Sequence, residues 1–150
     1  MAIQTPLGDI HTLQTGEKVE HISYERLQDE SSSTQVEREL QEYFSGNRVI
    51  FDLRVAPEGT LLQKQIWEEM QKIPFGETVT YAELAKRVGR PEAWRAVANA
   101  CGKNPIVIVI PCHRVVGSYG KLGGYSGGLE RKQWLLQHEA AVLSRISRKN

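Results

Sequence analysis

The sequence predicts an α/β protein of the α+β type, in which a small strand-rich N-terminal domain with one helix precedes a mostly helical C-terminal domain. Three observations lead to this prediction. Apolar and polar residues alternate within the first 24 residues, apolar residues recur at helical spacing from residue 61 onward, and residues 56–60 have the composition of a linker. We expect domains at residues 1–56 and 61–150, joined by residues 57–60.

The N-terminal domain is expected to begin with antiparallel strands at residues 10–13 and 18–24, after a turn. A helix follows, whose apolar residues recur at helical spacing until a glycine ends it (Val36, Leu40, Tyr43, Phe44 and Gly46). Residues 49–53 predict one more strand. His11 and His21 lie on the predicted strands without a cysteine nearby, so we expect surface histidines and no metal site.

The two parts of the chain carry opposite charges. Residues 1–58 contain five basic and eleven acidic side chains, a net charge of −6, whereas residues 59–150 contain fourteen and seven, a net charge of +7. The formal charge of the whole chain, +1, conceals this division. A basic C-terminal part favours a polyanion such as nucleic acid as its partner.

Composition excludes several other classes of protein. Of the 150 residues 40% are hydrophobic and 25% charged, as in ordinary globular domains. No apolar run approaches the roughly 18–20 residues of a membrane span, and the first residues do not resemble a signal peptide, so we expect a cytoplasmic protein that does not bind membranes. The two cysteines, Cys101 and Cys112, are expected to be free thiols.

The C-terminal domain predicts a helix-turn-helix. After a first helix with an apolar face, Thr80 and Glu83 match a capping box for a second helix that ends at Gly89. A third helix runs from Ala93 to Cys101 after a short turn. In a helix-turn-helix the last of these helices enters a groove of nucleic acid. The pattern also fits an Ala-rich helix buried in a core, and these residues alone leave that alternative open.

One short segment carries the residue types of a reactive site. Residues 106–110 are five consecutive β-branched residues, which predict a fully buried strand or extended segment, and Cys112 follows two positions later beside His113 and Arg114. Histidine and arginine favour the thiolate form of a nearby cysteine, so a reactive Cys112 is one hypothesis. The alternative is a small buried hydrophobe, as most free cysteines are. Glu139 is a candidate to orient the histidine.

A glycine-rich loop separates this segment from the last predicted helix. Six of the twelve residues 117–128 are glycine, which brings backbone N–H groups close to a ligand. The loop lacks the Gly-Lys-Ser/Thr ending of a phosphate-binding loop, so a flat polar ligand edge fits it better than a triphosphate.

These residues resemble the O6-alkylguanine-DNA alkyltransferases, also called methylated-DNA-protein-cysteine methyltransferases. The resemblance rests on four short motifs (residues 95–97, 104–105, 111–116 and 124–128) and on the spacing from Cys112 to Glu139. It is close over residues 61–140 and looser before them. It implies a ribonuclease-H-like N-terminal scaffold and a winged-helix-like C-terminal domain. Alkyltransferase-like proteins replace the acceptor cysteine, whereas this chain keeps it.

The resemblance implies direct repair of DNA without a cofactor. An alkyl group, chiefly methyl, is expected to pass from O6 of a flipped guanine to Cys112, irreversibly and once per protein molecule. His113 is expected to act as the base through a bridging water, and Glu139 to orient His113. Asn104 is expected to brace the turn that holds Cys112, and Tyr81 to donate to the guanine as the alkyl group leaves.

The resemblance also implies how duplex DNA is bound. The second helix of the helix-turn-helix is expected in the minor groove, where Arg95 fills the space of the flipped nucleotide. The expected DNA contacts are those of Arg95, Tyr81, Ala93, Ala96 and Arg114. The expected pocket for the base is formed by Val115, Tyr125, Ser126, Gly127 and Trp94. We expect a monomer without an obligatory protein partner.

Two other functions remain open at this stage. One is a DNA-binding regulator or damage sensor that transfers nothing, and the other is a cysteine-dependent hydrolase that uses Cys112, His113 and Glu139. Cys101 is expected to pack its helix, with redox pairing to Cys112 as the alternative. The basic residues 144–150 either fray or contact phosphates.

Overall fold

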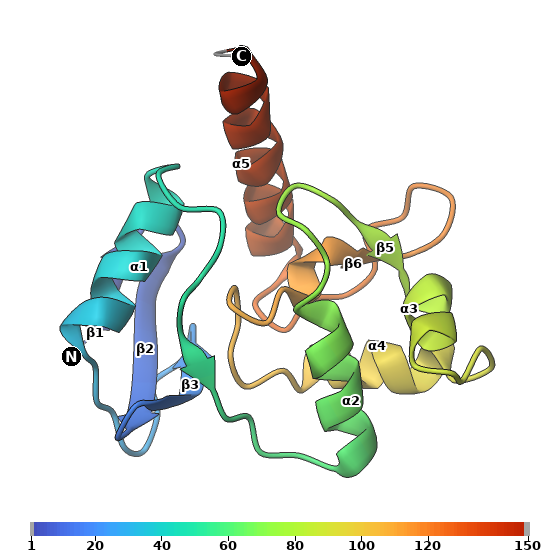
Figure 1. Ribbon diagram of the computed structural model, residues 1–150, viewed down its shortest axis with the longest axis horizontal. Coiled ribbons are helices and arrows are strands. Elements are labelled where there is room, and N and C mark those ends of the chain that lie inside the picture. The colour runs from blue at the N-terminus through green and yellow to red at the C-terminus, as the bar shows by residue number, and fades with distance from the viewer. Residues whose placement is uncertain (1, 149–150) are drawn as a thin grey trace. The chain divides into compact units, whose positions relative to one another are not determined.

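The computed structural model describes residues 2–148 and confirms the mixed α+β class (Figure 1). The chain divides into two units. Unit 1 comprises Met1–Glu58 and Pro105–Val109, and unit 2 comprises Gly59–Asn104 and Ile110–Asn150. The segment Pro105–Val109 therefore groups with unit 1 and not with the C-terminal domain to which the sequence assigned it. No helix within the described residues is both long and apolar enough to cross a membrane.

Unit 1 is a four-stranded sheet with one helix beside it (Figure 1). Its elements are β1 (Ala2–Thr5), β2 (Gly8–Thr15), β3 (Lys18–Ser23), α1 (Thr34–Phe44) and β4 (Arg54–Val55). The first three strands pair antiparallel and β4 pairs parallel with β3. The strands predicted at residues 10–13 and 18–24 and the predicted helix are confirmed, whereas β1 was not expected. The core joins apolar side chains of sheet and helix (Ile3, Ile10, Val19, Ile22, Val36, Leu40 and Tyr43).

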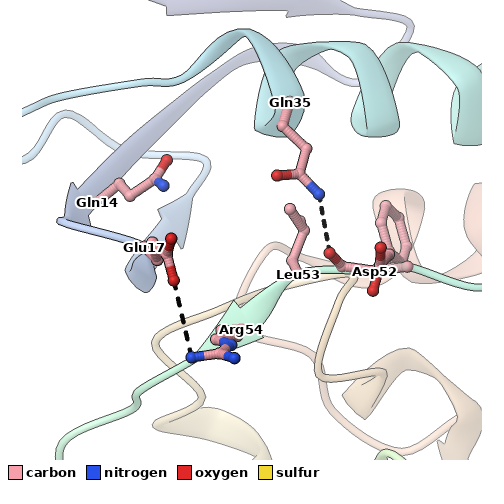
Figure 2. A pocket seen from close by; sticks show the side chains of 7 residues that line it. Gln14, Glu17, Gln35, Asp52, Leu53 and Arg54 are labelled. Carbon is pink, nitrogen blue, oxygen red and sulfur yellow. Dashed lines mark hydrogen bonds and ion pairs between the residues drawn. The ribbon is translucent and has the colours of Figure 1, made fainter.

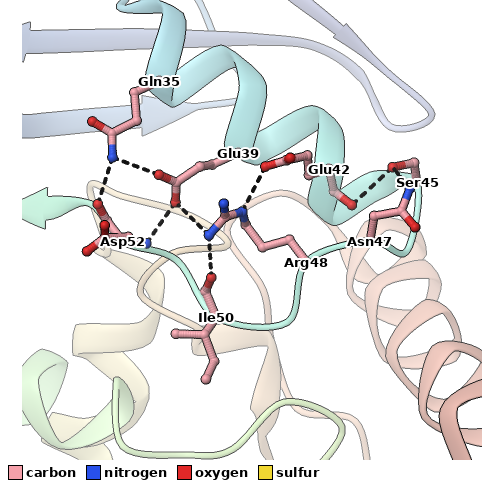
Figure 3. A network of polar contacts seen from close by, with 8 residues as sticks. All are labelled: Gln35, Glu39, Glu42, Ser45, Asn47, Arg48, Ile50 and Asp52. Carbon is pink, nitrogen blue, oxygen red and sulfur yellow. Dashed lines mark hydrogen bonds and ion pairs between the residues drawn. The ribbon is translucent and has the colours of Figure 1, made fainter.

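The strand predicted for residues 49–53 is wrong. Side chains of α1 bind the backbone of this segment in place of a neighbouring strand (Figure 3). Glu39 Oε1 accepts a hydrogen bond from the Asp52 amide at 2.7 Å, and Gln35 Nε2 donates to the Asp52 carbonyl at 2.9 Å. Because these side chains satisfy the backbone groups that a ladder would use, strand pairing begins only at β4.

The fully buried strand or extended segment predicted for residues 106–110 is also wrong, although all of these residues except the half-buried Val109 are buried. Ile106 makes a single parallel bridge to Ile22, and the chain then turns tightly. The Val109 amide donates to the Val107 carbonyl at 2.8 Å around the residue between them, Ile108, whose φ is 74°. β-Branched residues rarely adopt this left-handed conformation. The flanking prolines offer no amide for a ladder, which favours turns over a strand.

Unit 2 consists of helices and one small parallel sheet. Its elements are α2 (Leu61–Met70), β5 (Val79–Thr80), α3 (Tyr81–Arg87), α4 (Trp94–Gly102), the 3-10 turn η1 (Cys112–Arg114), β6 (Val115–Val116) and α5 (Leu129–Arg148). Helices α2, α3 and α4 pack on one another, and Trp67 on α2 donates from Nε1 to the Ala100 carbonyl of α4 at 2.9 Å. Helices α3 and α4 form the predicted helix-turn-helix, with Gly89 at φ 78° after α3.

Helix α3 begins at a cap that the sequence predicted in part. The Thr80 hydroxyl accepts from the Glu83 amide at 3.1 Å, as expected for the first half of a capping box. The Glu83 carboxylate pairs with Arg87 at 3.1 Å. A complete capping box instead begins α2, where Thr60 and Gln63 bond reciprocally.

Strands β5 and β6 place the start of α3 next to η1. They pair in parallel, with Val79 opposite Val115 and Thr80 opposite Val116. Tyr81 directly follows β5, and η1 directly precedes β6. This short pairing therefore brings Tyr81 toward the turn that contains Cys112.

Replacing Glu39 by alanine is expected to destabilise unit 1. Glu39 is buried, and its Oε1 also lies 3.3 Å from Arg48 Nη1. Arg48 keeps a second carboxylate partner, Glu42, at 3.0 Å. Because the loss of Glu39 removes one of these two partners and leaves the Asp52 amide without its acceptor, we expect the free energy of unfolding to fall by about 2 kcal/mol. Urea denaturation of the intact chain measures the loss. Glu37→Ala, at an exposed position of α1, is the control and costs less than about 1 kcal/mol; equal losses would contradict the supporting role of Glu39.

Candidate active site

Cys112 begins η1 and is completely enclosed, with 1% of its surface exposed. Asn104 lies just beyond the end of α4, and its Nδ2 donates to the Ile110 carbonyl at 2.8 Å and to Cys112 Sγ at 3.1 Å. The Cys112 amide also donates to the Ile110 carbonyl at 2.8 Å. The Asn104 amide group therefore links the end of α4 to the turn that holds the sulfur.

The surroundings of Cys112 favour the neutral thiol in the resting protein. Burial raises the pKa of Cys112 to about 11, while the Asn104 hydrogen bond and the Lys132 charge act in the opposite direction. Burial therefore opposes the thiolate form that the neighbouring His113 and Arg114 are expected to favour, because removal of the sulfur from water disfavours its charged state. Reaction at Cys112 requires that its proton be removed.

A buried network surrounds the Glu139 carboxylate, which comes from α5. His113 Nε2 lies 2.7 Å from Oε2, and Arg114 donates from Nε to Oε1 at 2.9 Å and from an Nη to Oε2 at 3.0 Å. The Gly76 amide donates to Oε1 at 2.9 Å. These hydrogen bonds and the adjacent charges hold the pKa of Glu139 well below its usual range although burial opposes this shift. The group is therefore a carboxylate at neutral pH.

The carboxylate decides the tautomer of His113. An ionised carboxylate only accepts hydrogen bonds, so Nε2 of His113 carries the hydrogen. Burial lowers the pKa of His113 and outweighs the opposing effect of Glu139, which keeps the ring neutral near pH 7. Nδ1 is therefore an acceptor, and it has no hydrogen-bond partner among the described residues. Nδ1 of His113, the residue next to Cys112, is therefore available to accept a proton.

Arg114 does not lie where a DNA contact would require it. Its guanidinium is buried, with two donors on Glu139 and a third, Nη1, on the Ile73 carbonyl at 2.8 Å. It also lies 5.6 Å from the Phe75 ring centroid. The burial of Arg114 therefore contradicts the DNA contact expected of it, because three of its five N–H donors are already used inside the protein.

Lys132 is a buried residue of the site that the sequence analysis missed. Its ammonium donates to the Val115 carbonyl at 2.7 Å and to the Gly124 carbonyl at 3.0 Å. It lies seven positions before Glu139 on α5, and both side chains are buried. Residues seven apart share one face of a helix, so the spacing from Glu139 could have indicated that Lys132 lies on the buried face. The Gly124 amide in turn donates to the Tyr81 hydroxyl at 3.1 Å.

The glycine-rich loop passes against Tyr81. Gly123 has φ 73°, and a Cβ atom at this position would collide with the Tyr81 ring and hydroxyl. Next in the loop, Tyr125 and Gly127 are half-buried and Ser126 is exposed. Val115 is buried, and its carbonyl is the one bound by Lys132. Glycine is required at position 123 by both the conformation and the close approach.

The residues expected to touch DNA on α4 lie around its N-terminal turn. Arg95 and Trp94 are exposed, and Ala93 and Ala96 are half-buried. The Arg95 guanidinium lies 5.2 Å from the Trp94 ring centroid. The structure thus groups Cys112, His113, Glu139, Asn104 and, through the loop, Tyr81, and it exposes the first turn of α4.

Two further observations concern metal ligands and a cavity in unit 1. Within residues 2–148 no group of three or more His, Cys, Asp or Glu side chains is placed to hold a metal ion, and His11 pairs with Glu30 at 3.0 Å. Unit 1 has an open cavity of about 370 Å³ that contains none of the expected site residues (Figure 2). Its polar lining includes an exposed ion pair, Arg54 with Glu17 at 3.7 Å.

Comparison with known proteins identifies clear relatives. The family profile "6-O-methylguanine DNA methyltransferase, DNA binding domain" matches residues 61–141. A protein of Methanosarcina barkeri named methylated-DNA–protein-cysteine methyltransferase is 41% identical over 148 residues, which cover 91% of this chain and 94% of that protein. A protein of the same name from Salmonella typhimurium is 45% identical over 124 residues, 82% of this chain and 72% of that protein.

Solved structures give the same result. The O6-methylguanine methyltransferase of Mycobacterium tuberculosis matches with a TM-score of 0.86 and 35% identity, over 93% of this chain and 91% of that chain. The M. tuberculosis protein OGT in complex with DNA matches with a TM-score of 0.88 and 36% identity, over 94% and 92%.

Glu139→Gln is expected to lower the free energy of unfolding at neutral pH and to make it depend less on pH in the acidic range. The amide leaves the Arg114 charge buried without a counter-ion, which costs about 3 kcal/mol at neutral pH. Because the pKa of Glu139 is lowered by folding, its contribution is complete above the ordinary value of 4.5 and is lost as the pH falls below it. Urea denaturation at several pH values measures both effects. Glu130→Gln, at an exposed position of the same helix, is the control, and an acid response of Glu139→Gln as steep as that of the unmodified protein contradicts the assignment.

Proposed function

The chain belongs to the 6-O-methylguanine DNA methyltransferase family, and we propose that it repairs DNA by transferring an alkyl group from O6 of guanine to its own Cys112. The observation that carries the proposal is the enclosed Cys112 thiol beside a neutral His113 whose Nδ1 is free to accept a proton. Cys101, the other cysteine, is buried without such a base beside it in sequence, and burial raises its pKa well above the usual range. Cys112 is therefore the acceptor.

His113 starts the reaction by accepting the Cys112 proton, through a bridging water. The Glu139 carboxylate stabilises the resulting imidazolium, as the acidic member of a catalytic triad does. The thiolate attacks the alkyl carbon, so that the S–C bond forms and the C–O6 bond breaks, and the electron pair passes to the guanine ring. The product is a thioether, a bond that none of the proposed active-site groups cleaves, so each molecule acts once.

Tyr81 completes the proton balance. Its hydroxyl accepts from the Gly124 amide, which leaves its own hydrogen available to the guanine ring as the alkyl group leaves. Burial raises the pKa of Tyr81, so the phenol is protonated before the reaction and recovers a proton from the His113 imidazolium afterwards. Restored guanine and neutral side chains result.

The first turn of α4 is the proposed DNA contact. Small side chains at Ala93 and Ala96 permit close approach of the helix to the minor groove, and the exposed Arg95 fills the space of the extruded nucleotide. Extrusion costs a few kcal/mol, less for a damaged pair, and a side chain in the vacated stack offsets part of it. Trp94, against Arg95, extends the stacking surface.

Further parts of the proposal concern the pocket and the state of the protein. Tyr125, Ser126, Gly127 and Val115 form the wall for the base. The partner is duplex DNA that contains alkylated guanine, and the protein acts as a cytoplasmic monomer without a cofactor or an obligatory protein partner.

Transfer to Cys112 is testable by mass spectrometry. Incubation with an oligonucleotide that contains O6-methylguanine is expected to add one methyl group to the tryptic peptide of residues 104–114 and to restore guanine, in one equivalent only. Cys112→Ser abolishes the transfer, whereas Cys101→Ser, which alters the peptide of residues 96–103, retains it. A methyl group on Cys101, an unmodified lesion or repeated turnover would contradict the proposal.

The role of His113 predicts a specific pH dependence. Because burial lowers the pKa of His113, the base is neutral at pH 7, and the transfer rate of the unmodified protein falls only as the pH drops through a value below 6.5. His113→Gln removes the base, so the rate at pH 7 falls by about 100-fold. It then rises with pH toward the Cys112 pKa of about 11. Single-turnover rates between about pH 5 and 9 distinguish the two profiles, and an unchanged profile in the variant excludes His113 as the base.

A further inference from the structure

Lys132 is fully buried, which is uncommon for lysine, and its ammonium makes two hydrogen bonds to backbone carbonyls. One carbonyl belongs to Val115, the first residue of β6, immediately after the turn that holds Cys112. The other belongs to Gly124 in the glycine-rich loop. Lys132 therefore ties the backbone beside the acceptor sulfur to the loop that faces the proposed base.

The same side chain acts on Tyr81. Its Nζ lies 5.9 Å from the Tyr81 ring centroid, within the range of a cation–π contact. The Gly124 amide donates to the Tyr81 hydroxyl, so the residue whose carbonyl Lys132 binds also positions that hydroxyl. Movement of the ammonium would release the loop and the phenol together.

The charge of Lys132 is not balanced in the way that the charge of Arg114 is. Arg114 pairs with the Glu139 carboxylate, whereas the hydrogen-bond acceptors of Lys132 are carbonyl oxygens without net charge. Burial lowers the pKa of Lys132, and negative charge on Cys101 or Cys112 raises it. The ammonium and a Cys112 thiolate therefore stabilise each other.

We propose that Lys132 is a positioning residue for alkyl transfer, which fixes the loop and Tyr81 around the base and supplies the positive charge that stabilises the Cys112 thiolate. This inference rests on the proposed function, because the thiolate is the species that attacks the alkyl group. It adds a fixed cation to the roles of His113, which moves the proton, and Asn104, which donates to the sulfur.

Lys132→Gln is the variant that separates charge from support, because the amide keeps an N–H donor for the carbonyls and loses the charge. Lys64→Gln, at an exposed position of α2, removes the same charge elsewhere in unit 2 and is the matched control. Circular dichroism and the midpoint of thermal unfolding establish that both variants fold.

The first readout needs no DNA. Iodoacetate and iodoacetamide each form a bond from sulfur to carbon and release iodide, and they are similar in size, but only iodoacetate is an anion. The ratio of their rates at Cys112, measured on the peptide of residues 104–114 near neutral pH, reports the local charge. The thiolate fraction and the opening of the site affect both rates equally and cancel. We expect Lys132→Gln to lower this ratio about threefold or more and Lys64→Gln to leave it unchanged.

The second readout is the single-turnover rate of methyl transfer from an oligonucleotide that contains O6-methylguanine, expected to fall about tenfold in Lys132→Gln. A variant that merely loosens the fold changes both reagent rates alike and leaves their ratio intact, which overturns the inference. An unmethylated Cys112 in the unmodified protein refutes the proposed function instead, and the reagent ratio still decides the role of Lys132.

Discussion

The buried carboxylate of Glu139 is the interaction on which the arrangement of the site depends. It comes from α5 and accepts hydrogen bonds from His113 and Arg114 of η1 and from the Gly76 amide before β5. Arg114 extends this connection to the Ile73 carbonyl after α2. Removal of a carboxylate from water costs several kcal/mol and is offset only when all its partners are in place. The network therefore fixes the relative positions of three segments that are distant in sequence, namely residues 73–76, η1 and α5.

The buried and the exposed residues around this network have different proposed roles. Asn104, His113 and Lys132, whose proposed roles concern the sulfur or the groups beside it, are enclosed, whereas Arg95 and Trp94 are exposed on α4. A neutral thiol with a raised pKa is a weak nucleophile toward small electrophiles in solution. The proposed reaction is therefore selective because the sulfur is activated only when the guanine lies beside it, with His113 as the proton acceptor and Lys132 as the fixed cation.

The sequence predicted the residues of the site better than their contacts. Cys112 and His113 are adjacent in one motif, so their partnership was visible without a fold, whereas the Arg114 donors point inward to α5, which spacing along the chain does not reveal. The β-branched residues before Cys112 indicated burial correctly and a strand wrongly, because a strand requires a partner with free backbone groups and β-propensity supplies none. At Asp52, side chains of α1 bind the backbone groups that a neighbouring strand would otherwise pair with. Lys132 was missed because lysine is ordinarily assigned to the surface.

The membership of Pro105–Val109 in unit 1 affects the order in which the chain folds during its synthesis. Backbone groups of Ile22 on β3 pair with the Pro105 carbonyl and the Val107 amide. During synthesis from the N-terminus these partners reach the sheet only after α2, α3 and α4 have left the ribosome, since domains otherwise fold as their residues emerge. The last backbone partners of β3 are thus added late, by the same few residues that lead into the reactive turn.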